Sequence, residues 1–209
     1  MKRSESRILT THTGSLPRSP ELQELLRSRL DPKAGEAEEF RTGVDEGVAD
    51  VVAKQVEIGI DVINDGEQGR VQYATYVKDR LTGFDGEQLL RARPRIDMVD
   101  FPEFGAQSGV SSSATIPWPA CTGPIAWKDK DAVQRDIQRL QATTSGVKSE
   151  EVFMTAASPG VIANFLVNEH YPSEEEYLYA LADVMKDDYK AIVDSGLLLQ
   201  IDCPDLAMT

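Results

Sequence analysis

The chain has 209 residues, of which 41% are hydrophobic, and its 22 Lys and Arg against 35 Asp and Glu give a formal charge of −13. These values are typical of a soluble, acidic globular protein, and a surface this negative argues against binding to nucleic acid or anionic lipid. No apolar stretch approaches the ~20 residues that span a bilayer, and the first residues lack a secretory pattern. Two cysteines, Cys121 and Cys203, exclude a disulfide scaffold, so we expect a cytoplasmic protein.

Residues 36–67 have the pattern of a helix followed by a buried strand. Apolar side chains at spacings of three and four predict an amphipathic helix over residues 36–58, which Gly59 ends. A short apolar run at 60–63 follows and ends in the polar cluster Asn64-Asp65-Gly66-Glu67. This pattern predicts a strand that delivers acidic side chains to a loop.

The same pattern returns in residues 173–202. Ser173 and Glu176 form a capping box at the start of a second predicted helix, and Gly196 ends it. The apolar run 197–201 then leads into Asp202. Because two separate helix–glycine–strand–acid units occur, we expect a repeated α/β construction with parallel strands.

Three further strands are expected at Arg7–Thr11, Ala114–Cys121 and Val152–Ala156, which makes about five βα units. The fold class is therefore α/β, either an open sheet or a (β/α)₈ TIM-type barrel, and five units would be an incomplete barrel because eight usually need ~250 residues. We interpret residues 1–209 as one domain with an irregular insertion around 84–120. Ligands bind at the carboxyl ends of parallel strands in either fold.

Candidate binding residues gather at those strand ends. In Thr-His-Thr-Gly-Ser-Leu-Pro-Arg (11–18), Gly14 and the Ser15 hydroxyl could hold a carboxylate or phosphate, and the alternative is an ordinary turn. Asp65 and Glu67 could bind an ammonium group or act as acid and base, and the alternative is a solvated loop in which Arg70 pairs with Glu67. Asp202 is the stronger candidate, because it ends an apolar strand where an uncompensated carboxylate is costly.

His12, His170, Cys121 and Cys203 are the nominal zinc ligands of this sequence. Their spacing includes neither a Cys-x-x-Cys nor a His-x-x-x-His pair, so buried, inert cysteines are the favoured interpretation. The sequence also has no Gly-x-Ser-x-Gly element and no dinucleotide or P-loop pattern.

Four segments in order resemble the cobalamin-independent methionine synthase family, in particular its single-barrel members: THTGSLPR (11–18), QVEIGIDVINDGEQGR (55–70), TAASPGVIANF (155–165) and LLLQIDCPDLAM (197–208). The resemblance covers the N-terminal portion of the catalytic barrel. It implies a zinc-dependent (β/α)₈ methyltransferase of methionine biosynthesis, a 5-methyltetrahydropteroyltriglutamate–homocysteine S-methyltransferase-like enzyme. Zinc there binds a thiol substrate as the thiolate that accepts the methyl group.

By position, the resemblance implies that Ser15, beside Gly14, holds the carboxylate of homocysteine and that Glu67 and Asp202 bind its ammonium group. Phe165 stands where the family has a tryptophan that stacks on folate, and Ala120 and Gly123 replace basic residues around Cys121, so the methyl donor is left open. The family's zinc ligands are expected on later strands, beyond Thr209, and none is assigned to this chain.

The first hypothesis is therefore a thiol methyltransferase to which this chain supplies the amino-acid clamp, with a second chain or a homodimer covering the open edges of the barrel. One alternative is a non-catalytic half-barrel binding or interaction module. Another is a superfamily relative that transfers alkyl groups to a different thiol, such as coenzyme M, or that decarboxylates uroporphyrinogen. The expected partners are small molecules, a thiol amino acid and a methyl donor.

Overall fold

The computed structural model describes residues 1–28, 38–89, 100–103 and 117–207. Its elements in chain order are α1 (Pro20–Ser28), α2 (Glu38–Glu57), β1 (Val62–Ile63), η1 (Tyr76–Asp79), β2 (Gly86–Leu89), β3 (Pro117–Ala120), α5 (Ala132–Thr144), β4 (Glu151–Ala157), α6 (Pro159–Phe165), α7 (Glu174–Asp194), β5 (Leu198–Asp202) and η3 (Pro204–Ala207). Within the described ranges, no helix is both long and apolar enough to cross a membrane.

The main sheet is parallel, in the order β1-β4-β5. The N-terminal segment joins its β1 edge through a parallel bridge between Thr11 and Val62, and the Val62 N–H donates to the carbonyl of Thr10 at 3.0 Å. The expected first strand is therefore reduced to this short contact. The predicted α/β class with parallel strands is confirmed.

Both long helices begin and end close to the predicted positions. The Ser173 hydroxyl accepts the Glu176 N–H and caps α7. Gly59 and Gly196 follow α2 and α7 with φ angles of 82° and 88°, in the left-handed region that side chains disfavour. The helix–glycine–strand units predicted from the sequence are thus confirmed.

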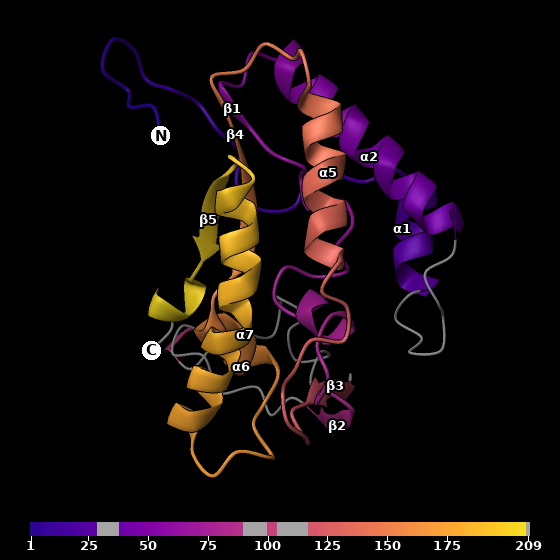
Figure 1. The fold of residues 1–209 in the computed structure, drawn as a ribbon, viewed down its shortest axis with the longest axis vertical. Coiled ribbons are helices and arrows are strands. Elements are labelled where there is room, and N and C mark those ends of the chain that lie inside the picture. The colour runs from indigo at the N-terminus through magenta and orange to yellow at the C-terminus, as the bar shows by residue number, and fades with distance from the viewer. Residues whose placement is uncertain (29–37, 90–99, 104–116, 208–209) are drawn as a thin grey trace.

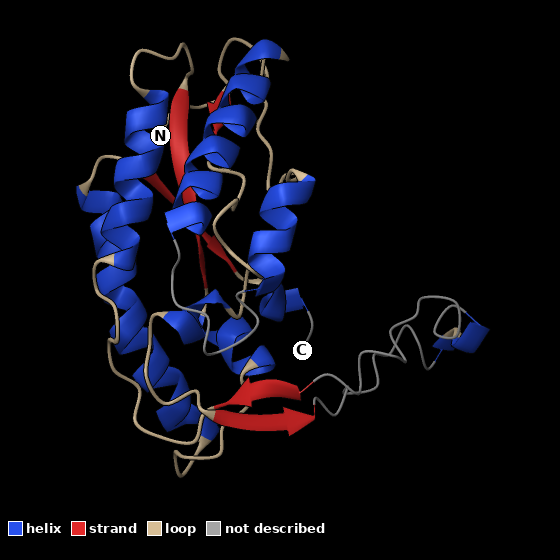
Figure 2. Cartoon of the chain, turned by 90° about the vertical axis from the view of Figure 1, so that its right-hand side faces the viewer, coloured by secondary structure: helices blue, strands red, loops and turns tan. Residues whose placement is uncertain are grey.

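The prediction for Ala114–Cys121 is wrong in its pairing. The strand there, β3, lies antiparallel to β2, with Gly86 opposite Ala120, and the two form a two-stranded sheet apart from the parallel sheet (Figure 2). Its direction is set by the partner strand, which the local sequence does not reveal. Residues 90–99 and 104–116, which make up much of the expected insertion, lie outside the described residues.

Two apolar clusters hold these layers together. Helices α1, α2, α5 and α7 pack in succession, and α7 lies against β4 and β5 (Figure 1). The first cluster joins α1, α2 and α5 to β1 and β4, and the second joins η1, α6 and α7. Burial of this apolar surface fixes the sheet relative to the helices, so the carboxyl ends of β1, β4 and β5 are held at one edge.

Candidate functional site: an acidic cluster at the carboxyl ends of the strands

Glu67 lies at the centre of the polar cluster that follows β1. Its side chain is 1% exposed, and its φ of 55° makes it the one non-glycine residue with positive φ among the described residues. A left-handed conformation costs a non-glycine residue about 1–3 kcal/mol and is often found at functional sites. The neighbouring turn supports it: Asp65 accepts the Glu67 N–H at 3.0 Å, and the Asn64 side chain accepts the Gly66 N–H at 2.7 Å.

The loop after Thr11 packs directly against this turn. The Leu16 N–H donates to the Gly66 carbonyl at 3.0 Å, and a Cβ at Gly66 would lie 2.9 Å from the Leu16 Cβ. Gly14 has a φ of 78°, and a Cβ placed there would meet no atom within 4 Å. Glycine is therefore favoured at this position by its backbone conformation and not by a close neighbour. The exposed Ser15 side chain therefore comes to lie beside Glu67.

Both carboxylate oxygens of Glu67 accept hydrogen bonds from protein side chains. The Ser15 hydroxyl donates to Oε2 at 2.6 Å, and the Thr155 hydroxyl of β4 donates to Oε1 at 3.1 Å. Arg70 does not pair with this carboxylate as the loop interpretation expected. Its guanidinium donates instead to the hydroxyl and the carbonyl of Thr155, at 2.8 and 2.6 Å.

Asp202 ends β5 and approaches the same cluster from the other side. Gln200 donates from one amide nitrogen to the Asp202 carboxylate at 3.0 Å and to the Thr13 hydroxyl at 2.8 Å. Burial raises the pKa of Asp202, and the nearby charge of Glu67 raises it further. Burial likewise raises the pKa of Asp65. The site therefore concentrates negative charge in a partly desolvated place, which favours a cationic ligand.

Two aromatic rings, Tyr73 and Phe165, pack against each other near the acids. Phe165, at the end of α6, packs edge-on against Tyr73 with ring centroids 5.8 Å apart. Burial raises the pKa of Tyr73, and the charges of Asp202 and Glu67 add to the effect. The structure thus brings together Gly14, Ser15, Glu67 and Asp202, with Phe165 nearby.

Sequence reasoning missed Thr155 and Gln200, which connect the acids to the rest of the site. The two residues are register partners on β4 and β5, so their side chains stand next to each other on one face of the sheet. A signal was present, since each is the single polar residue of an otherwise apolar run, at 152–156 and 197–201. Its meaning depended on pairing, which the sequence does not show.

The four nominal zinc residues do not come together. Among the described residues, no three His, Cys, Asp or Glu side chains are grouped so that they could hold a metal ion. Cys121 is fully buried with its thiol near the Gly123 carbonyl, and Cys203 is partly exposed at the end of β5. His12 carries a buried Nε2 for which the described part of the chain supplies no hydrogen-bond partner.

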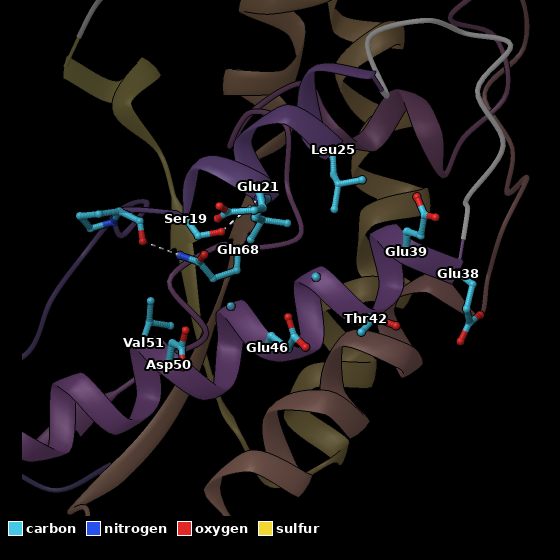
Figure 3. Close-up of a pocket in the computed structure, with 14 residues that line it drawn as sticks. Ser19, Glu21, Leu25, Glu38, Glu39, Thr42, Glu46, Asp50, Val51 and Gln68 are labelled. Atoms are coloured by element: carbon cyan, nitrogen blue, oxygen red, sulfur yellow. Dashed lines mark hydrogen bonds between the residues drawn. The ribbon is translucent and has the colours of Figure 1, made fainter.

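A separate pocket of about 650 Å³ lies between α1 and α2 (Figure 3). Five acidic side chains line it: Glu21, Glu38, Glu39, Glu46 and Asp50. Gln68, the residue after Glu67, lines this pocket. Ser15, Glu67 and Asp202 do not line it. The pocket is therefore distinct from the candidate site.

Comparisons with known proteins agree with the family resemblance. The family described as "Cobalamin-independent synthase, Catalytic domain" matches residues 8–92. A methionine synthase from Sulfolobus acidocaldarius is 26% identical over 93% of this chain and 51% of its own length. A 5-methyltetrahydropteroyltriglutamate–homocysteine methyltransferase from Cronobacter sakazakii is 38% identical over 36% of this chain and 10% of its own length.

Solved structures show the same fold. A B12-independent methionine synthase from Shewanella, in complex with selenomethionine, superposes with a TM-score of 0.70 at 22% identity, over 93% of this chain and 51% of that one. A putative vitamin-B12 independent methionine synthase from Listeria monocytogenes gives a TM-score of 0.60 at 20% identity, over 94% and 53%. This chain spans about half the length of the curated relatives that it matches over most of its residues. The resemblance of the chain to the cobalamin-independent methionine synthase family is thereby confirmed.

Proposed function

We propose that this chain supplies the amino-acid-binding part of a cobalamin-independent methyltransferase that acts on homocysteine or a closely similar thiol. The observation that carries the proposal is Glu67, a buried carboxylate in a strained backbone conformation, held at both oxygens beside Asp202. The names of the relatives support the reaction class, since they are methionine synthases and a homocysteine methyltransferase. They give no support to a non-catalytic module or to alkyl transfer to coenzyme M.

Glu67 and Asp202 would bind the ammonium group of the amino acid. A carboxylate has about four lone-pair sites, so Glu67 retains acceptor capacity after its bonds to Ser15 and Thr155. The raised pKa of Asp202 has burial and the charge of Glu67 as its causes, and a bound ammonium would relieve that repulsion. Two partly desolvated acids are thus better suited to a cation than to an anion or a neutral ligand.

The turn at Gly14 and Ser15 would bind the carboxylate of the same amino acid. The Ser15 hydroxyl donates to Glu67, so the backbone N–H groups of the turn are the donors we assign to the carboxylate. The carboxylate of the amino acid would then contact N–H donors, and its ammonium group would contact carboxylates. We place the methyl donor on the side of Phe165 and Tyr73, whose rings offer an apolar face next to the acids.

Zinc, which the resemblance implies, stays a prediction for the complete catalytic unit. The described residues do not supply a fitting ligand set, so we assign no step through zinc to this chain. We further propose that the parallel sheet forms part of a (β/α)₈ barrel, because the solved relatives align with it over about half of their length. A second chain or a second copy that completes this barrel belongs to the same proposal.

Binding of L-methionine, the product of the proposed reaction, tests the clamp directly by isothermal titration calorimetry. We expect Asp202→Ala and Glu67→Gln each to weaken binding by more than ~10-fold, since a desolvated charge pair is worth several kcal/mol. In a complete enzyme, the same Asp202→Ala change should raise the KM for homocysteine to a similar extent.

Two controls make this experiment specific. Glu46→Gln removes an acid from the separate pocket on α2 and should leave the affinity unchanged. The analogue 4-(methylsulfanyl)butanoate lacks the ammonium group, so its binding should not respond to Asp202→Ala. Equal affinity of wild-type protein and both clamp variants for L-methionine would refute the proposed clamp.

A further inference from the structure

Three buried side chains form a hydrogen-bonded row that runs from Glu67 into the core. Glu67, Thr155 and Arg70 are 1%, 2% and 4% exposed, respectively. Arg70 Nη1 lies 2.8 Å from the Thr155 hydroxyl, which lies 3.1 Å from Glu67 Oε1. Arg70 follows Glu67 by three residues, whereas Thr155 comes from β4, so the row exists only in the folded chain.

The direction of each hydrogen bond in this row is determined by chemistry. A guanidinium has donors and no acceptor, so the Thr155 oxygen must accept from Arg70. The hydroxyl hydrogen of Thr155 is then available, and Glu67 Oε1 is the acceptor within reach. With the Ser15 hydroxyl on Oε2, both oxygens of Glu67 accept, which is the pattern of an ionised carboxylate.

Arg70 is itself held rigidly in place. Its second nitrogen donates to the Thr155 carbonyl at 2.6 Å, and its guanidinium lies over the ring of Tyr76, 4.4 Å from the centroid. The carbonyl of Arg70 accepts a bond from Arg18 at 3.0 Å. A rigid donor fixes the rotamer of Thr155, and Thr155 in turn fixes the plane of the Glu67 carboxylate.

The hydroxyl between the two charges has an electrostatic consequence. A direct ion pair between Arg70 and Glu67 would occupy the carboxylate and weaken its attraction for another cation. With Thr155 in between, the carboxylate is oriented by one hydrogen bond at Oε1 and one at Oε2, which leaves acceptor capacity on both oxygens. This arrangement suits a group that must bind a cation reversibly.

We infer that Thr155, oriented by Arg70, is a positioning residue that fixes the plane of the Glu67 carboxylate and directs its free lone pairs at the ammonium group of the substrate. The inference rests on the proposed function for the identity of that cation. The hydrogen-bonded row itself does not depend on it.

The test compares Thr155→Val, which removes the hydroxyl at nearly constant shape, with Thr155→Ser, which keeps it. We expect Thr155→Val to bind L-methionine about tenfold more weakly, the usual effect of losing a hydrogen bond to a charged group. Thr155→Ser should bind within about twofold of wild type, because the hydroxyl still reaches Glu67. Binding of 4-(methylsulfanyl)butanoate should be the same in all three proteins.

A second readout in the ligand-free protein separates this inference from the proposed function. The side-chain carboxylate carbon of Glu67, observed by ¹³C NMR and assigned with Glu67→Gln, should shift in Thr155→Val and return in Thr155→Ser. If it shifts in this way while wild-type protein does not bind L-methionine, the positioning role stands and the proposed function fails. Should Thr155→Val not fold, Thr155→Ala takes its place in both measurements.

An unchanged Glu67 resonance in the variant without the hydroxyl would overturn the inference. So would an equal loss of affinity for L-methionine and for the analogue without an ammonium group, because that result indicates a general disturbance of the site.

Discussion

The Ser15 hydroxyl donates to the Glu67 carboxylate at 2.6 Å, although 52 residues separate the two in the chain. This contact joins the loop after the first, N-terminal sheet segment to the turn after β1. The hydroxyl hydrogen of Ser15 is used in this hydrogen bond. In the ligand-free protein the Ser15 hydroxyl therefore donates to Glu67 and has no hydrogen left to donate to a substrate carboxylate. The candidate site therefore depends on the packing of two loops against each other.

Removal of this hydroxyl should weaken binding of the amino acid without unfolding the protein. We expect Ser15→Ala to lower the affinity for L-methionine about tenfold, since a bond to a charged group is lost. Ser15→Thr, which retains a donor, is the matched control. L-methionine methyl ester lacks a free carboxylate, and if Ser15 acts through Glu67 the loss should persist with this ligand. A loss confined to L-methionine would instead assign the hydroxyl to the substrate carboxylate.

Binding of L-methionine should weaken as the pH falls through the raised pKa of Asp202. Burial and the charge of Glu67 raise that pKa, and only the ionised form attracts an ammonium group. The affinity for L-methionine is therefore highest above this pKa. As the pH is lowered, the affinity begins to fall at a higher pH than it would if Asp202 had the pKa of an ordinary carboxyl group. Calorimetry across the acidic range should show this decrease in wild-type protein, and Asp202→Asn should lack it. Persistence of the decrease in the variant would point to another group.

Gly66 should resist substitution more than glycines in open turns. Gly66→Ala places a Cβ 2.9 Å from the Leu16 Cβ in a residue whose φ is 61°. We expect the free energy of unfolding to fall by about 1–3 kcal/mol from strain alone, with a further loss from the clash. Gly146→Ala is the matched control, because its φ is 76° and nothing lies within 4 Å. Denaturant unfolding of both variants checks the difference, and equal losses would mean that the contact with Leu16 adjusts freely.

Asp61 should stabilise the protein at neutral pH and lose this effect in acid. Its carboxylate accepts bonds from Arg7, at 2.7 and 2.5 Å, and from the Thr10 N–H, at 2.7 Å, and the bond to Arg7 is the main cause that lowers its pKa. A lowered pKa contributes stability above the unfolded value of about 3.9, which is lost as the pH falls through the folded value. Asp61→Asn should therefore reduce the Tm at pH 7, and the difference from wild type should shrink in acid.

Asp194→Asn provides the control for that measurement. Asp194 pairs with Lys190 on the exposed surface of α7, where such pairs contribute little. Its loss should hardly change the Tm at either pH. A constant difference between wild type and Asp61→Asn at all pH values would show that the effect of Asp61 is not ionic.

The sequence by itself determined the local elements and the identity of the acids. Periodic apolar residues and the glycines Gly59 and Gly196 were enough to place α2 and α7 to within a few residues, because helix formation depends on neighbours along the chain. Apolar runs that end in Asp65 and Asp202 indicated the strand ends in the same way. The four ordered segments carried the family resemblance. The expected parallel strands were the reason to predict that one edge of the sheet holds Gly14, Ser15, Glu67 and Asp202.

Only the tertiary structure decided which strands pair and what holds the acids. The antiparallel pairing of β3 with β2 depends on a partner distant in the chain, so a local pattern could not distinguish it from a parallel strand. Thr155 and Gln200 are part of the site because the pairing of β4 with β5 places them side by side. The position of Thr155 on β4 also explains why Arg70 donates to Thr155 and does not pair with Glu67. A neutral hydroxyl or amide acquires such a role from its neighbours in space, since a buried polar group must find a partner wherever the fold supplies one.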